Sequence, residues 1–121
     1  MEKGRRPARR KATAPKRPST ASSHEINHAF VSALSHPTRR ELLRFYLGSD
    51  RPLSPKELAE RTGENLSTIS YHVRVLADKY AIELAEEEAV RGSVAHFYRA
   101  SALARGTAWV RESLDLDLPK P

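Results

Sequence analysis

Apolar residues recur along this chain with the spacing of helices, and in two places with the spacing of strands. From Leu66 onward they fall at Ile69, Val73 and Leu76, one stripe of a helix. Similar patterns predict further helices over residues 24–34, 37–48, 54–62 and 101–114. Alternating positions predict strands over 82–87 and 94–99, with a turn at 88–93. The pattern therefore predicts a fold that is mostly α with a small antiparallel β-hairpin, an α+β class.

Two of the expected helices meet at a tight corner between residues 54 and 76. Ser54, Pro55 and Glu57 form a helix-start signature, with Ser as N-cap and Glu reaching back from the third position. Gly63 is expected to end that helix with a positive φ. Asn65 is expected to cap the next helix. This arrangement predicts a helix-turn-helix.

The outward face of the second helix has an unusual composition for a solvated surface. It carries short hydroxyls, an aromatic ring, a His and an Arg, with no acidic residue between Leu66 and Ala77. Such side chains let a helix approach phosphates and base edges closely. We therefore predict a DNA-recognition helix over residues 66–78; the alternative is an exposed helix of chance composition. The predicted contacts are Ser67, Thr68, Ser70, Tyr71, His72 and Arg74.

The expected hairpin supplies a second candidate contact. Arg91, Gly92 and Ser93 lie at its tip, where an Arg is placed to enter a minor groove or meet a phosphate. Residues 86–88 are three consecutive glutamates that would repel DNA, so only the tip is expected to approach it. The alternative is an ordinary hairpin with an exposed Arg.

Four segments in order along the chain resemble the arsenical-repressor (ArsR) type of transcription regulator. They are ALSHPTRRELL (33–43), ELAERTG (57–63), STISYHVRVL (67–76) and VRGSVAHFYRA (90–100). The resemblance implies a winged helix-turn-helix fold, a repressor function and a homodimer built from the terminal helices. Tyr80 stands where that family usually has a helix-ending Gly, so the helix must exit differently or tolerate strain.

The resemblance also implies which residues form the dimer contact and what symmetry the operator has. Intramolecular packing of the first helix against the last is the alternative role for these side chains. The operator is expected to be an imperfect inverted repeat, because two recognition helices enter successive major grooves about 34–36 Å apart. The predicted dimer residues are Ile26, Phe30, Leu103, Trp109, Val110 and Leu114.

The positive charge of the chain is concentrated in its first 23 residues. Of 21 basic and 15 acidic side chains, residues 1–23 hold eight basic and one acidic, which leaves residues 24–121 close to neutral. This segment is expected to be disordered and to add sequence-independent DNA affinity. A solubilising leader and a transit peptide are the alternatives. Its predicted phosphate contacts are Arg5, Arg6, Arg9, Arg10, Lys11, Lys16 and Arg17.

Several other functions are not expected. The chain has no Cys, which excludes disulfides, zinc fingers and thiolate metal sensing. The string His24-Glu25-Ile26-Asn27-His28 matches a metalloprotease motif, but it lies at a helix end with no third ligand nearby. Exposed helix residues are the default interpretation; a two-His regulatory metal site completed across a dimer is the alternative. Arg39 and Arg40 are expected to serve surface packing and solubility. We predict no enzyme activity, metal, cofactor or membrane span.

The sequence thus predicts a cytoplasmic, nucleoid-associated prokaryotic DNA-binding regulator whose effector is unknown. Its expected parts are a basic tail (1–23), a winged helix-turn-helix domain (24–116) and a frayed end (117–121). A nucleoid-type architectural DNA binder driven by the tail remains an alternative. So does a winged-helix module that binds protein, because the domain without its tail is nearly neutral.

Overall fold

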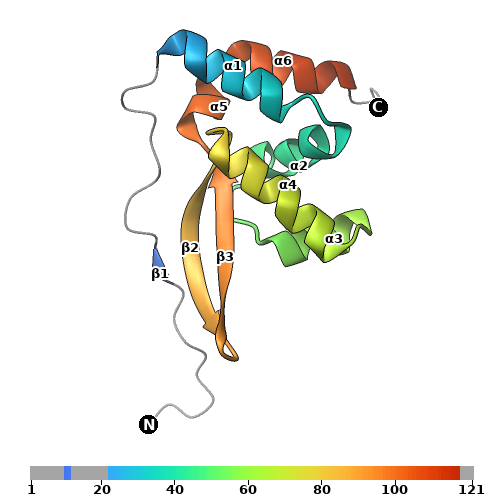
Figure 1. Cartoon of the computed structure of the whole chain (residues 1–121), viewed down its shortest axis with the longest axis vertical. Coiled ribbons are helices and arrows are strands. Elements are labelled where there is room, and N and C mark those ends of the chain that lie inside the picture. Colours follow the sequence, from blue (N-terminus) through green and yellow to red (C-terminus); the bar gives the residue numbers. More distant parts are fainter. Residues whose placement is uncertain (1–9, 12–21, 118–121) are drawn as a thin grey trace.

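The computed structural model describes residues 10–11 and 22–117. Its helices are α1 (Ser23–Ala33), α2 (Pro37–Leu47), α3 (Pro55–Thr62), α4 (Leu66–Asp78), α5 (Ala102–Gly106) and α6 (Ala108–Asp117). Its strands are β1 (Arg10–Lys11), β2 (Ile82–Val90) and β3 (Ser93–Ala100). In Figure 1, α1 and α6 lie side by side, α2 and α4 lie beneath them, and β2 and β3 project away as a long hairpin.

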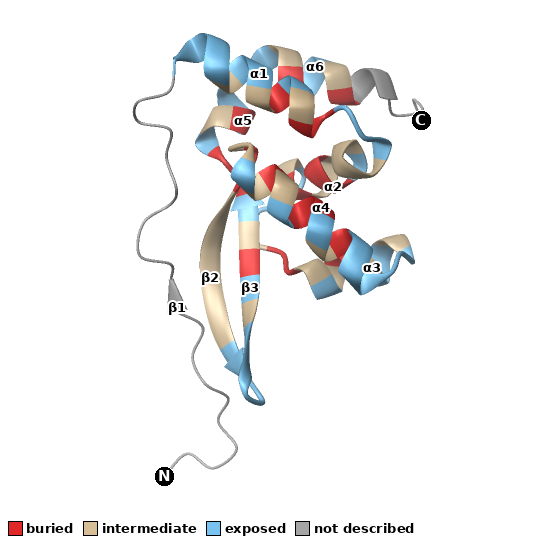
Figure 2. Cartoon of the chain, in the orientation of Figure 1, coloured by how far each residue is buried: buried red, intermediate tan, exposed pale blue. Residues whose placement is uncertain are grey.

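One apolar core joins the helices and the base of the hairpin. The buried side chains are on the facing sides of the helices, and exposure rises toward the hairpin tip (Figure 2). Burial of such apolar side chains is the main stabilising contribution to the fold, at about 1.5–3 kcal/mol for each large one. The largest fully buried side chains are Tyr46, Phe30, Leu42, Leu43, Leu53, Leu58, Ile69, Leu76, Val73 and Val110.

The helix starts follow the capping chemistry that the sequence indicates. Ser54 and Glu57 form a reciprocal capping box at α3, and Asn65 Oδ1 accepts a hydrogen bond from the backbone N–H of Ser67 at 2.8 Å. Gly63 ends α3 with φ of 77°, as predicted. A second capping box, not predicted, joins Ser22 to Glu25 and starts α1 one residue earlier than expected.

The hairpin is longer than the sequence pattern predicts. β2 and β3 pair antiparallel from Ile82 opposite Ala100 to Val90 opposite Ser93, with a register shift between Leu84 and Glu86. The strands reach the tip because the turn needs only two residues, Arg91 and Gly92, with φ of 45° and 82°. At the base of the hairpin, Leu53 and Tyr98 exchange two backbone hydrogen bonds of 2.8 and 2.9 Å.

The single helix expected over 101–114 is wrong, because the chain breaks it into α5 and α6. Thr107 between them is extended, with φ of −99° and ψ of 104°. Gly106 just before it costs about 1 kcal/mol relative to Ala within a helix. The Thr107 hydroxyl donates to the Leu103 carbonyl at 2.6 Å, and the Thr107 carbonyl accepts from Val110 at 3.1 Å. The break lets α6 turn back along α1.

The chain leaves α4 through a residue in the left-handed region. Tyr80 has φ of 67°, so the chain tolerates the backbone strain that was expected where the resembled family usually has Gly. The Ser101 hydroxyl donates to the Tyr80 carbonyl at 2.6 Å and accepts from the Ala104 N–H at 3.0 Å. Ser101 therefore joins the end of α4 to the start of α5.

Part of the basic segment has regular structure, which differs from the expectation of disorder throughout residues 1–23. In β1, Arg10 lies opposite Glu87 and Lys11 opposite Glu86, antiparallel to β2. The outer edge of β2 offers backbone groups for this pairing. Ser22 and Ser23 belong to the start of α1. The other predicted tail contacts, Arg5, Arg6, Arg9, Lys16 and Arg17, lie outside the described residues.

Candidate nucleic-acid interface

The exposed side of α4 is where most of the predicted recognition residues lie. Ser67, Thr68, Tyr71 and Arg74 are exposed, and Ser70 is half-buried. The Tyr71 side chain is 53% exposed, which is unusual for a ring of its size. Thr68, Tyr71 and Arg74 follow one another at intervals of three residues, with Ser67 beside Thr68, so the four exposed residues form one ridge that faces solvent.

The α3–α4 corner fixes the start of this ridge. The Asn65 side chain caps α4 and also accepts from the Ser67 hydroxyl at 2.6 Å, so Ser67 is held at the first turn. The N-terminal turn of a helix carries partial positive charge, which favours a phosphate there. Arg74 lies near β3: burial raises the pKa of Tyr98, and the charge of Arg74 partly opposes that rise.

The prediction that His72 belongs to the outward face is wrong. Only 6% of His72 is exposed, and it shares the buried stripe with Ile69, Val73 and Leu76. Position 72 lies three residues after Ile69 and four before Leu76, a helical spacing that could have placed it inward. His72 therefore packs against the rest of the chain and does not offer its side chain to DNA.

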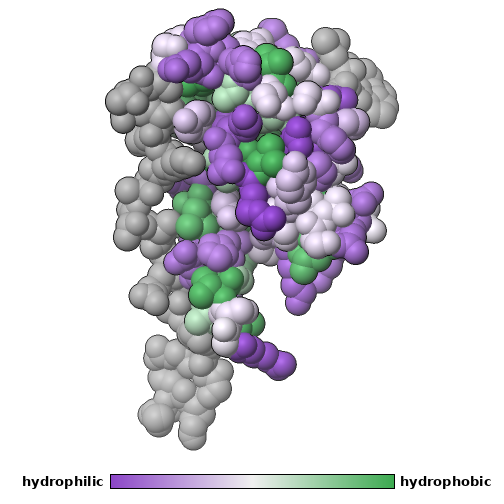
Figure 3. All heavy atoms as spheres, in the orientation of Figure 1, coloured by the Kyte–Doolittle hydropathy of each residue, from purple (hydrophilic) through white to green (hydrophobic). Residues whose placement is uncertain are grey.

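The hairpin tip supplies a second exposed surface. Arg91 is exposed at the two-residue turn, and Ser93 closes the turn by donating its hydroxyl to the Val90 carbonyl at 3.1 Å. Val90 and Val94 expose large apolar side chains beside it. On the face seen in Figure 3, the apolar side chains form small separate patches within a mostly hydrophilic surface. Arg91 is therefore the cationic side chain at the hairpin tip.

A groove lies between the hairpin and the two helices of the corner. It has a volume of about 630 Å³ and is lined by Ser70 and Arg74 of α4 and by side chains of the hairpin from Glu88 to Tyr98. Lys56 of α3 also lines it and is exposed. Lys56 is not among the residues that the sequence predicts as contacts. Its place in the first turn of the first corner helix was the available signal.

The chain resembles known proteins in sequence and in structure. Residues 34–86 match the family described as Helix-turn-helix domain, a span from the end of α1 to the middle of β2. No curated protein sequence matches the chain. Among solved structures, the homodimeric winged helix-turn-helix DNA-binding domain of Mb0332 from Mycobacterium bovis is 20% identical, with a TM-score of 0.59. The matched region spans 87% of this chain and 93% of the Mb0332 domain. That domain is described as a possible ArsR-family transcriptional regulator.

Two further structures have the same architecture. HlyU from Vibrio cholerae is 20% identical with a TM-score of 0.55, covering 78% of this chain and 90% of its own. NolR from Sinorhizobium fredii is 19% identical with a TM-score of 0.53, covering 86% of this chain and 92% of its own. The chain is a winged helix-turn-helix protein. The fold class implied by the ArsR resemblance is confirmed, and β2–β3 is the wing.

The comparisons also bear on the class of function. The matched family is a helix-turn-helix domain, and the Mycobacterium bovis structure is a DNA-binding domain. The winged helix-turn-helix protein is therefore similar to DNA-binding regulators. None of the helices in the described part of the chain is long and apolar enough to cross a membrane.

The predicted dimer residues divide into buried and partly buried groups. Phe30, Val110 and Leu114 are buried within the chain itself, where they pack α1 against α6. The rings of Phe30 and Trp109 lie 6.3 Å apart, and the Trp109 ring N–H donates to Asn27 Oδ1 at 3.2 Å. Intramolecular packing thus accounts for three of the six. The other three, Ile26, Leu103 and Trp109, are half-buried at the rim of this pair.

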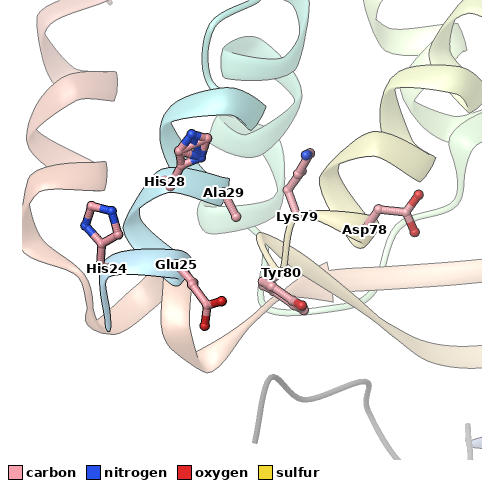
Figure 4. Close-up of a pocket in the computed structure, with 7 residues that line it drawn as sticks. All are labelled: His24, Glu25, His28, Ala29, Asp78, Lys79 and Tyr80. Carbon is pink, nitrogen blue, oxygen red and sulfur yellow. The ribbon is translucent and has the colours of Figure 1, made fainter. Parts of the chain in front are cut away.

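The His-Glu-x-x-His string lines an open pocket between α1 and the end of α4. His24, Glu25 and His28 face Asp78, Lys79 and Tyr80 across it (Figure 4). The Glu25 carboxylate accepts from the Ser22 N–H at 2.8 Å as part of the capping box. Within residues 22–114, no three His, Asp or Glu side chains are grouped closely enough to hold a metal ion. Glu25 thus has a structural role in capping α1.

Proposed function

We propose that this winged helix-turn-helix protein is a homodimeric, sequence-specific transcription repressor of the ArsR type. Its α4 would lie in the major groove of double-stranded DNA, with Ser67, Thr68, Ser70, Tyr71 and Arg74 as contacts. Arg91, Gly92 and Ser93 of the wing and the basic segment 1–21 would contact the backbone or the minor groove. The observation that carries the proposal is the acid-free exposed ridge of α4 beside a groove that also collects Lys56 and Arg74.

The charges of the described residues support contact at the ridge and the tip only. Glu86, Glu87 and Glu88 lie along β2, where they would repel phosphates and keep the middle of the wing away from DNA. Glu87 also lies 3.5 Å from the His96 ring, and Glu83 pairs with Arg99 at 2.9 Å. The acidic strand thus limits the orientations in which the protein can approach a duplex.

The homodimer is proposed on the exposed rim of the α1–α6 pair. Val31 of α1 is 59% exposed, and Ile26, Leu103 and Trp109 are half-buried around the same pair of helices. A second copy would cover these side chains by the same two-fold contact on each protomer. The homodimeric state of the Mycobacterium bovis domain supports this choice.

The decisive experiment measures DNA binding by fluorescence anisotropy on the full chain. The duplexes are the upstream region of the protein's own gene and a scrambled duplex of equal length. Arg74→Ala is expected to weaken binding to the upstream duplex by about 1–3 kcal/mol if Arg74 reads a base, and to reduce the preference over the scrambled duplex. Arg111→Ala removes the same charge from the exposed side of α6 and is the matched control.

Two alternatives make different predictions in the same experiment. An architectural binder would show no preference for the upstream duplex and would lose binding when residues 1–21 are removed; the concentration of basic residues in that segment favours it. A protein-interaction module would bind neither duplex. An unchanged preference in Arg74→Ala would count against base reading by that residue.

A further inference from the structure

A polar cluster lies at the edge of the core, on the side of α4 that faces away from the ridge. Its members are the buried His72, the half-buried Arg39 and the exposed His36. His72 is one of three polar residues that are buried among residues 22–114, the others being the caps Ser54 and Ser101. Its ring centroid lies 4.5 Å from that of His36, the residue that caps α2. It also lies 5.1 Å from Tyr71, edge to face, so the cluster touches one of the ridge residues.

Arg39 of α2 links this cluster to a third helix. Its Nη1 lies 3.2 Å from His72 Nδ1, and its Nε donates to the Ala33 carbonyl at 2.7 Å. Its Nη2 donates to the Ser32 carbonyl at 3.4 Å. A cation bound to the last carbonyls of a helix is favourable because those carbonyls carry partial negative charge. One guanidinium thus connects the end of α1 with the middle of α4, which corrects the expected surface role of Arg39.

The hydrogen-bond partner of His72 determines which of its ring nitrogens carries the proton. A guanidinium can only donate, so His72 Nδ1 must accept from Arg39. His36 Nδ1 likewise accepts from the backbone N–H of Thr38 at 3.1 Å. The His72 ring that binds Arg39 is therefore neutral, with its proton on Nε2. Protonation of His72 would place an N–H against the N–H groups of Arg39 and a positive charge beside another.

We propose that Arg39 and His72 are a positioning pair that holds the recognition helix in place only while His72 is neutral, so that DNA binding is lost as His72 gains a proton. This inference rests on the proposed DNA-binding function. His72 touches no DNA here; it acts through Tyr71 and through the position of α4 relative to α1 and α2. Neither residue is a contact in the proposed interface.

The charges around the ring support this direction. Burial lowers the pKa of His72, and the nearby His36 and Arg39 of the α2 side lower it further. Glu64, in the loop before α4, opposes them weakly. Because the pKa in the fold lies below the ordinary value of about 6.5, the pair is complete above that pH. Its contribution is lost as the pH falls below about 6.5 and through the lowered pKa.

The direction of the pH dependence of DNA binding distinguishes the effect of His72 from that of the exposed histidines. The chain has five histidines, and protonation of exposed ones adds positive charge, which strengthens binding to DNA. A DNA-binding protein of this kind would therefore bind more tightly in acid. The positioning pair predicts the opposite: binding to the upstream duplex should weaken as the pH is lowered from 7.5 to 5.5.

The test uses the full chain at constant ionic strength over this pH range. His72→Asn places an amide oxygen where Nδ1 stood, so it keeps the acceptor for Arg39 but cannot titrate. It should bind as the parent does at pH 7.5 and keep that affinity at pH 5.5. His28→Asn is the matched control on the exposed side of α1 and should retain the parental loss of affinity. Full pH dependence in His72→Asn would overturn the proposal.

A second measurement does not depend on DNA. Histidine side-chain NMR on the parent protein should report a neutral His72 with its proton on Nε2 and a pKa below the ordinary histidine value of about 6.5. Arg39→Gln should raise the pKa of His72 and weaken binding at pH 7.5. A pKa of His72 at or above the ordinary histidine value of about 6.5 would overturn the pair. Absence of DNA binding at every pH, with the NMR result as expected, would instead refute the proposed function alone.

Discussion

At the residue scale, the chain has two non-glycine residues with positive φ among those described, Tyr80 and Arg91. Backbone strain of this kind costs about 1–2 kcal/mol per residue and persists only where surrounding contacts enforce it. The Ser101 hydroxyl holds Tyr80, whereas Arg91 is exposed at the wing tip with only the turn itself to hold it. The strain at Arg91 is thus the more informative case for function.

Replacing Arg91 separates backbone strain from charge. Arg91→Asn creates Asn-Gly, the dipeptide best suited to a two-residue turn with positive φ at both positions. It should raise the free energy of unfolding in urea by about 0.5–1 kcal/mol while weakening DNA binding. Arg91→Ala should lose the same affinity without the gain in stability. A fall in stability for Arg91→Asn would contradict the argument.

At the element scale, the position of each helix depends on a few polar side chains that satisfy helix ends. The Arg105 guanidinium donates to the carbonyls of Tyr46, Leu47 and Ser49 at 3.3 Å, joining α5 to the end of α2. Arg40 donates to the Leu34 carbonyl at 2.8 Å, so it too binds a helix end and is not a simple surface charge. These contacts fix the positions of α1, α2 and α5 relative to one another, and α2 in turn packs against α4.

The corner between β3 and α5 gives a test at this scale. Ser101→Ala removes the buried hydroxyl that caps α5 and binds the Tyr80 carbonyl. It should lower the free energy of unfolding by about 2–3 kcal/mol, because a cap is lost and a buried carbonyl is left unsatisfied. Ser22→Ala removes the exposed cap of α1 and should cost about 1 kcal/mol. Equal losses in urea unfolding would argue against a special role for Ser101.

At the scale of the whole molecule, the proposed regulator requires two copies to read an inverted repeat. Val31 and the half-buried rim of the α1–α6 pair are the apolar surface available for that contact. Because Phe30, Val110 and Leu114 are already buried within one chain, they contribute by supporting the helix pair.

Charge at Val31 tests the dimer directly. Val31→Glu should shift the protein from dimer to monomer in analytical ultracentrifugation and weaken binding to the full inverted repeat, since each half-site contact is then made alone. Val90→Glu, an equally drastic change on the exposed wing, should leave the sedimentation of the dimer unaltered. A dimer that survives Val31→Glu would move the interface elsewhere.

The basic segment also matters at the scale of the whole molecule. Residues 1–23 account for the net positive charge of the chain, because the remaining residues are close to neutral. Arg10 and Lys11 lie opposite Glu87 and Glu86 in the β1–β2 pair, so the acidic strand that would repel DNA faces positive residues of the same chain. This pairing places β1 beside the wing, on the edge of β2 (Figure 1).

Local chemistry in the sequence was sufficient for the helix-turn-helix and most of the hairpin. The apolar stripe of α4, the capping signals of Ser54 and Asn65, and the need for positive φ at Gly63 act within a few residues of each other. Such interactions are readable from the sequence because they do not depend on distant parts of the chain.

The tertiary structure alone decided which polar residues turn inward and where the last helix breaks. Periodicity gives the line of a buried stripe, but its width depends on how many elements pack against the helix. Contacts of α4 with Arg39 and His36 widen its buried face to include His72. The position of α6 against α1 likewise decides that Phe30 and Leu114 lie in the core, because burial is a property of the packed neighbours and not of the residue.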